Sequence, residues 1–157
     1  MEKGFDEWNI AKKTIHNQQN RAGFREREIW FCRAGINVGF EEDGSGDKFL
    51  RPVVVLKKFN GALFLAIPLT RTPRYGKYYF KVVDGCGVSF AMLAQARVMD
   101  AKRLYYRSRT MLDVVFKELE NKFQRAIVKN NPHREGGVGP KAKGSKAIPE
   151  NGSDVIL

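Results

Sequence analysis

The sequence predicts a mainly β protein of the α+β class, built as a small twisted barrel of the SH3-like type. Three observations support this. Short β-branched and aromatic segments, separated by turn residues, recur from residue 28 to residue 107. The pair Asn60-Gly61 lies between two apolar segments and predicts a two-residue hairpin turn. Apolar residues at helical spacing precede and follow these segments, so we expect an extra N-terminal helix and a C-terminal helix. An open sheet with the last helix across one face is the alternative.

The N-terminal helix is predicted by an apolar stripe. Phe5, Trp8, Ala11 and Ile15 fall three to four residues apart, the spacing that places side chains on one face of a helix. The polar run 16–20 then ends this helix and leads into a linker. We expect the stripe to lie on an apolar surface.

The strands follow in order. We expect them at 28–35, 51–57, 62–69, 77–83, 88–93 and 95–99, with a short edge at 105–107. Segments 88–93 and 95–99 form either two strands or one bent strand. The acidic loop, residues 36–49, is long and contains several glycines. Because ordinary connections are shorter, its length favours a functional role.

The C-terminal helix is expected to begin with Thr110 as N-cap and Asp113 in its first turn, where a carboxylate complements the helix dipole. Its apolar face consists of Leu112, Val115, Phe116, Leu119, Phe123 and Ile127. After residue 130 the periodicity stops, and the composition becomes rich in Gly, Pro, Lys and Ser. We therefore expect a helical extension at 1–24, a barrel domain at 25–130 and a basic, disordered tail at 131–157.

The net charge is the strongest property of the composition. A formal +11 favours a polyanionic partner, although many basic proteins bind no nucleic acid. The two cysteines, Cys32 and Cys86, lie far apart without metal-ligand spacing, so we expect free thiols. No apolar segment is long enough to cross a bilayer, and the N-terminus lacks a signal-peptide pattern. A cytoplasmic protein without membrane partners is the expectation.

Standard active-site patterns are missing from the sequence. Its two histidines, His16 and His133, lie outside the strand segments, which makes a histidine-based nuclease or a Ser-His-Asp site improbable. The acidic loop lacks the calcium-loop pattern, and no phosphate-binding GxxxxGK[ST] occurs. An enzyme with this sequence would work without a metal or a nucleotide cofactor.

One chemistry suits the residues that remain. RNA carries its own nucleophile, the 2′-hydroxyl, so a protein that cleaves it must hold the phosphate, neutralise its developing charge and move protons. An arginine neutralises such charge well, and a threonine hydroxyl donates a hydrogen bond. Arg51 opens one strand of the predicted hairpin and Thr70 closes the other, so both are expected at one edge of the sheet. A carboxylate from 41–47 would take the proton.

Several segments resemble those of PemK/MazF-type toxins, the ribonucleases of toxin–antitoxin pairs. They are REIWFCRAGINVGFEEDG, RPVVVL, LAIPLT and VSFAMLAQARVMDAKRL, which occur in the family's order across 27–129. The resemblance implies an SH3-like barrel, usually dimeric, that cleaves single-stranded RNA without metal by 2′-hydroxyl attack. It also implies inhibition by an acidic antitoxin that folds along the basic RNA groove.

The resemblance implies a role for each matched residue. Arg51 matches the arginine that stabilises the phosphate, Thr70 the threonine beside it, and Glu41 the loop glutamate. Gln95 and Arg97 match a Gln-x-Arg segment that contacts RNA. Many relatives carry an acidic residue before this glutamine, where this chain has Ala94, and the departure shifts the role of base to Glu41.

Further RNA contacts are expected from the basic segment after Thr70. Arg71, Arg74 and Lys77 would provide a track for phosphates, and Tyr75 a ring for base stacking, although a solvated loop would have the same composition. The alternative function is a non-catalytic toxin of the same barrel class, one that binds nucleic acid or inhibits gyrase.

Overall fold

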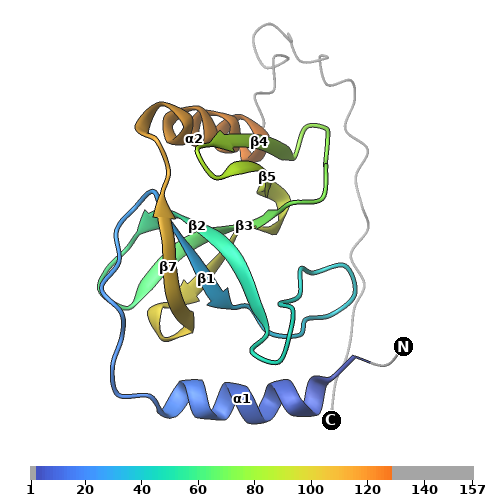
Figure 1. Ribbon diagram of the computed structural model, residues 1–157, viewed down its shortest axis with the longest axis vertical. Helices are drawn as coiled ribbons and strands as arrows, with labels where there is room; N and C mark the ends of the chain where they lie inside the picture. Colours follow the sequence, from blue (N-terminus) through green and yellow to red (C-terminus); the bar gives the residue numbers. More distant parts are fainter. Residues whose placement is uncertain (1–2, 129–157) are drawn as a thin grey trace, which may run out of the picture.

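The computed structural model describes residues 3–128 of the 157-residue chain. Figure 1 shows two helices at opposite ends of a strongly bent sheet. In chain order the elements are α1 (Phe5–Asn17), β1 (Glu28–Arg33), β2 (Leu50–Lys58), β3 (Leu63–Thr70), β4 (Tyr79–Asp84), β5 (Gly87–Met92), the 3-10 helix η1 (Leu93–Gln95), β6 (Arg97–Asp100), the 3-10 helix η2 (Ala101–Arg103), β7 (Leu104–Thr110) and α2 (Asp113–Ile127). The predicted tail at 131–157 lies outside the described residues.

The sheet is antiparallel and branches at β3. Its main path runs β4-β5-β3-β2-β1-β7, and β6 pairs with β3 beside that path. The first half of β3 pairs with β6, from Leu63 to Ala66, whereas Leu69 and Thr70 pair with β5. This change of partner bends the sheet, so that β6, β3, β2, β1 and β7 curve into a barrel (Figure 1). The predicted small twisted barrel is confirmed, but among the described strands no β6–β7 pairing closes it.

Two apolar cores lie on the two faces of β2 and β3. Val54 and Ile67 belong to the core that also contains Phe116 of α2. Val53 and Phe64 belong to the second core, inside the barrel. Because side chains alternate along a strand, a strand covered on both faces is apolar at every position. This explains the uninterrupted VVVL run in β2.

The hairpin and the last helix differ in detail from their predictions. The β2–β3 connection spans residues 59–62 and is longer than the two-residue turn that was predicted. Within it, the Asn60 side-chain oxygen accepts hydrogen bonds from the backbone amides of Ala62 and Leu63, at 2.8 Å each. Thr110 is not an N-cap. It pairs with Glu28 as the last residue of β7, and α2 begins after Leu112 without a side-chain cap. Pairing with β1 therefore extends the predicted edge at 105–107 into a full strand.

Helix α1 packs across the end of the barrel farthest from α2 (Figure 1). Trp8 and Ile15 are buried, whereas Phe5, the first residue of the predicted stripe, is about half exposed at 47%. The centres of the Trp8 and Phe49 rings lie 5.3 Å apart, and the Arg103 guanidinium lies 5.5 Å from the centre of the Trp8 ring. Neither described helix is long and apolar enough to cross a membrane.

Two buried carboxylates connect strands of the sheet. Glu28 accepts hydrogen bonds from the Trp30 indole at 2.9 Å, from the Arg25 amide at 3.0 Å and from Arg107 of β7 at 3.2 Å. Asp84 of β4 pairs with Arg109 of β7 at 2.7 Å. Removing either arginine would leave a buried charge without its cationic partner.

Candidate active site

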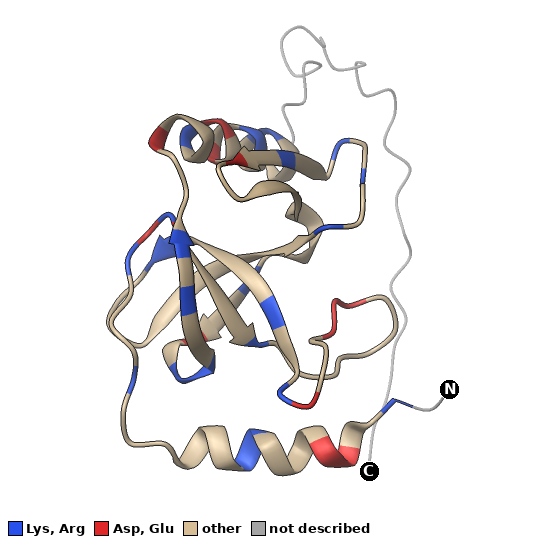
Figure 2. Cartoon of the chain, in the orientation of Figure 1, with Lys and Arg blue, Asp and Glu red and all other residues tan. Residues whose placement is uncertain are grey.

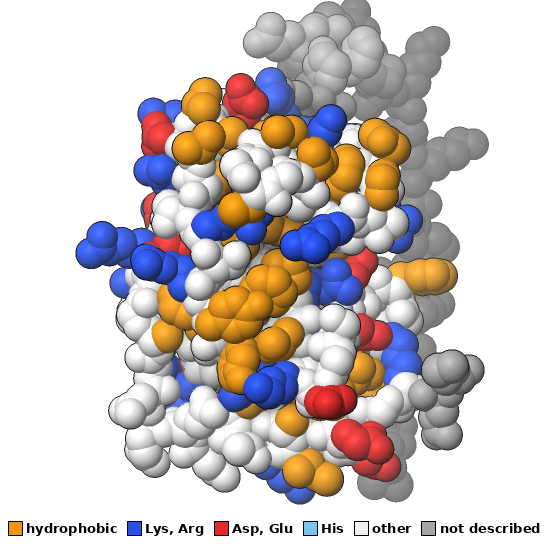
Figure 3. All heavy atoms as spheres, in the orientation of Figure 1, with side chains coloured by type: hydrophobic (Ala, Val, Ile, Leu, Met, Phe, Trp, Pro, Cys, Tyr) orange, Lys and Arg blue, Asp and Glu red, His pale blue; other side chains and the backbone are white. Residues whose placement is uncertain are grey.

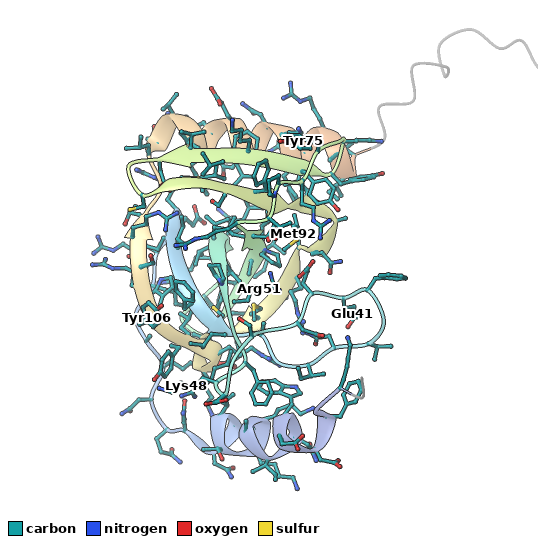
Figure 4. The ribbon with its side chains drawn as sticks, turned by 45° about the vertical axis from the view of Figure 1, so that its right-hand side comes forward. Glu41, Lys48, Arg51, Tyr75, Met92 and Tyr106 are labelled. Carbon is teal, nitrogen blue, oxygen red and sulfur yellow. The ribbon has the colours of Figure 1, made fainter. Side chains whose placement is uncertain are left out.

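A pocket of about 360 Å³ lies between the acidic loop, β2, β3 and the segment from η1 to β6. Five of the residues singled out from the sequence line it: Glu41, Arg51, Ala94, Gln95 and Arg97. Figure 4 shows Arg51 inside the fold and Glu41 on the loop that extends beside it. The bend of the sheet thus brings together residues that lie more than forty positions apart in the sequence.

Arg51 is one of two arginines that line this pocket. Its strand is held by the pairing of Arg51 with Cys32 of β1. The guanidinium lies 2.9 Å from a Glu42 carboxylate oxygen, donates to the Asp43 carbonyl, and reaches the Leu69 carbonyl of β3 at 3.4 Å. These contacts fix the orientation of the guanidinium at the pocket wall.

Thr70 is not among the residues that line the pocket. The last β2–β3 pair at this end is Val53 with Pro68, and Thr70 itself pairs with Phe90 of β5. Val53 and Pro68 line the pocket, so alternation along the strands directs Thr70 to the same face. The Thr70 hydroxyl accepts a hydrogen bond from the Thr72 backbone amide at 3.2 Å, within the turn that follows β3.

The acidic loop places two neighbouring glutamates differently. The Glu41 carboxylate accepts a hydrogen bond from the Val38 amide at 3.3 Å, within its own turn, whereas the Glu42 carboxylate pairs with Arg51. The Gln95 side chain supports the loop through two hydrogen bonds. Its oxygen accepts one from the Glu42 backbone amide at 3.3 Å, and its nitrogen donates one to the Phe40 carbonyl at 3.0 Å. Glu42 was missed in the sequence, because nothing in a run of acidic residues distinguishes one side chain from the next.

A second arginine, Arg97, lines the pocket, and Arg103 lies near Arg97. Arg97 of β6 donates to the Asn37 side chain at 3.3 Å. Arg103, also missed in the sequence, donates to the Arg33 carbonyl at 3.0 Å. Burial, and then the nearby charge of Arg97, lower the pKa of the Arg103 guanidinium. Arg97 therefore adds positive potential to the pocket that Arg51 also lines.

The basic loop, residues 71–78 between β3 and β4, lies outside the pocket. Arg71, Arg74 and Lys77 are exposed on it, and none of them lines the pocket. Figure 2 shows these cationic residues along the loop. Tyr75 is also exposed, with its ring 5.8 Å from that of Phe90. The loop follows Thr70 directly and adds exposed cations outside the pocket.

An apolar surface lies beside these basic groups. Phe31 of β1 stacks on Tyr106 of β7 with ring centres 4.7 Å apart, and Tyr106 is 45% exposed. Phe31 also pairs with Pro52 of β2. Figure 3 shows apolar side chains gathered over the middle of this face, with Lys and Arg side chains around them.

Solved structures similar to this chain include a MazF protein and mycobacterial endoribonucleases. MazF from Deinococcus radiodurans aligns with a TM-score of 0.54 and 20% identity, over 68% of this chain and 96% of that one. The fold is that of the MazF toxins. A mycobacterial endoribonuclease in complex with its cognate antitoxin aligns with a TM-score of 0.51 and 10% identity, over 66% of this chain and 94% of that one. A further mycobacterial endoribonuclease aligns with a TM-score of 0.51 and 10% identity, over 69% of this chain and 94% of that one.

The likeness to MazF is one of fold, because these identities are low. No family model matches the sequence, and no curated protein matches it. The roles of individual residues in the MazF fold of this chain therefore have to be argued from its own pocket.

Proposed function

We propose that this protein is the toxin of a toxin–antitoxin pair and cleaves single-stranded RNA at specific sequences by attack of the 2′-hydroxyl, without a metal ion. The observation that carries the proposal is Arg51, an arginine oriented at the wall of a pocket of about 360 Å³ in a chain with the MazF fold. That volume falls within the range of pockets that enclose small ligands, which suits one nucleotide.

The proposed reaction forms one bond and breaks one. The ribose 2′-oxygen attacks the adjacent phosphorus as its proton passes to a base, the bond from phosphorus to the 5′-oxygen breaks, and that oxygen takes up a proton. The products are a 2′,3′-cyclic phosphate and a 5′-hydroxyl. Arg51 neutralises the charge that develops on the phosphate, and the Thr70 hydroxyl donates a hydrogen bond to it. Glu41, a carboxylate of the pocket lining, is the proposed base.

RNA on either side of the cleaved bond would follow the basic surface. Arg71, Arg74 and Lys77 are exposed on the loop that follows Thr70, and Gln95 and Arg97 line the pocket. Phosphate contacts of this kind make binding weaker as salt is raised. The exposed Tyr75 ring would stack on a base.

Two protein partners belong to the proposal. A cognate acidic antitoxin would bind along the same basic surface by charge complementarity, as the net charge of +11 favours. The mycobacterial relative in complex with its cognate antitoxin supports this partner by analogy of fold. A homodimer would cover the apolar surface around Phe31 and Tyr106, which in a single chain faces water.

The test compares purified variants on a mixed-sequence single-stranded RNA in EDTA. The parent protein should cut at defined sequences and leave cyclic-phosphate ends, and Arg51→Ala should lower the cleavage rate on the order of a thousandfold. Thr70→Val should lower the rate by less, on the order of tenfold, because it removes one hydrogen bond. Arg125→Ala is the matched control, since it removes the same charge from an exposed site on α2.

The outcomes separate the candidate functions. Equal loss of cleavage in Arg51→Ala and Arg125→Ala would refute a role of the pocket. Binding of RNA without cuts would favour the non-catalytic alternative, and cuts that require added metal would refute the proposed chemistry.

A further inference from the structure

The guanidinium of Arg51 is already paired with a carboxylate of its own chain. Glu42 lies 2.9 Å from it, and the side chains of Arg51 and Glu42 are 20% and 27% exposed. The same guanidinium also donates hydrogen bonds to the Asp43 and Leu69 carbonyls. A phosphate that uses the Nη2 atom of Arg51 competes with Glu42, which already pairs with that nitrogen.

The N-terminal segment holds the loop that carries Glu42. Lys3 forms an ion pair with Asp43 at 2.8 Å, and the same ammonium donates to the Asn37 carbonyl at 2.8 Å and to the Gly39 carbonyl at 3.3 Å. One cation thus connects both ends of the turn that presents Glu42. Figure 1 shows the start of α1 directly beside this loop.

The docking of α1 fixes Lys3 in place. The Trp8 indole packs on Gly35, where the loop leaves β1, and on Phe49, where the loop returns to β2. At the other end of the helix, Lys102 donates to the His16 carbonyl at 2.6 Å. The segment 3–17 is therefore attached to both ends of the acidic loop and to the barrel.

We propose that the segment 3–17 is an autoinhibitory element, which holds the acidic loop closed so that Glu42 competes with RNA phosphate for Arg51. The identity of the competing ligand rests on the proposed function, whereas the closed loop rests on the contacts of Lys3, Trp8 and Glu42. Only the fraction of molecules with an open loop binds phosphate, so the apparent affinity falls in proportion to that fraction. Loosening the segment raises the fraction.

The experiment uses the full chain and three variants. Lys3→Ala removes the link to the loop, and Glu42→Gln removes the competing charge. Lys12→Ala is the control, because Lys12 is an exposed cation of the same helix with no ion pair among residues 3–128. Lys3→Ala and Lys12→Ala remove equal charge, so any general loss of attraction to RNA is the same in both.

Two readouts are measured on each variant. The first is the rate at which phenylglyoxal modifies Arg51, followed by mass spectrometry without RNA. The second is the affinity for a fully 2′-O-methylated RNA, which has no free 2′-hydroxyl and is not cleaved. Glu42→Gln should raise the modification rate and the RNA affinity on the order of tenfold, and Lys3→Ala should raise them on the order of threefold. Lys12→Ala should leave the modification rate unchanged and should bind the RNA no more tightly than the parent.

The two readouts distinguish the two proposals. If no variant binds the RNA, the proposed function fails, and the modification rate alone decides on the autoinhibitory contact. Equal modification of Arg51 in Lys3→Ala and Lys12→Ala, or no increase in Glu42→Gln, would overturn the inference.

Discussion

Two glycines, Gly35 just before the acidic loop and Gly39 within it, can be used to measure how strongly α1 is attached to the loop. Gly35 and Gly39 both have positive φ, 85° and 56°, a conformation that costs any other residue free energy. They differ in their surroundings. A Cβ at Gly35 would lie 2.1 Å from the Trp8 ring, whereas a Cβ at Gly39 would meet nothing within 4 Å. Replacing each by alanine thus separates the backbone cost from the cost of displacing the indole.

The expected magnitudes follow from these two costs. Alanine at positive φ costs roughly 1–2 kcal/mol, partly offset by roughly 0.4–1 kcal/mol of lost freedom in the unfolded chain, so Gly39→Ala should lower the free energy of unfolding by about 1 kcal/mol. Gly35→Ala carries the same backbone cost and must also move Trp8. Overpacking of this kind adds about 1–3 kcal/mol. The total for Gly35→Ala should be about 2–4 kcal/mol.

The assay is urea unfolding of both variants and the parent, followed by tryptophan fluorescence. If the indole is expelled before the barrel unfolds, the emission of Gly35→Ala shifts to the red in the absence of urea, and that of Gly39→Ala does not. Equal stability of the two variants, without any such shift, would refute the packing of α1 on the loop.

Three further predictions concern the sheet and its connections. Arg109→Ala should lower the free energy of unfolding by about 2–3 kcal/mol in urea titrations, since it leaves the buried Asp84 carboxylate unpaired; no loss would contradict that role. Burial raises the pKa of Glu28, but its hydrogen bonds outweigh burial and lower the pKa below 4.5. Its stabilising contribution is therefore present above about pH 4.5 and is lost as the pH falls through the lower folded value, so Glu28→Gln should flatten the acid side of a stability–pH curve; an unchanged slope would contradict this. Thiol reagents should label Cys86 in the native protein and Cys32 only after unfolding, because Cys32 is buried and burial raises its pKa; rapid native labelling of both would disprove it.

Much of the fold could be predicted from local patterns, because most strands are bounded by turn residues that are readable in the sequence. The β2–β3 hairpin is an example: Asn60 indicated the turn, although its side chain forms a longer loop than a two-residue turn. Thr110 is the opposite case. Its sequence context suits an N-cap, but pairing with Glu28, far away in the chain, makes it the end of β7. Local propensity cannot anticipate such tertiary pairing.

The candidate site was predictable in its residue types and only partly in its contacts. Arg51 was expected at a strand edge, and it does line the pocket. Which of the two glutamates, Glu41 or Glu42, pairs with Arg51 depends on the path of the acidic loop. Gln95 and Lys3 fix that path from distant parts of the chain. Trp8 was expected to pack on an apolar surface, but the sequence did not say that this surface is the loop that closes over Arg51.

The chemistry assigned to the Arg51 pocket is tested most directly by comparing an RNA with a DNA of the same sequence, in EDTA and at low salt. We expect the parent protein to cut the single-stranded RNA into fragments with 2′,3′-cyclic phosphate ends, and to leave the DNA intact, because only RNA brings its own nucleophile. Equal cutting of RNA and DNA, or RNA fragments that end in a 3′-hydroxyl, would contradict the account.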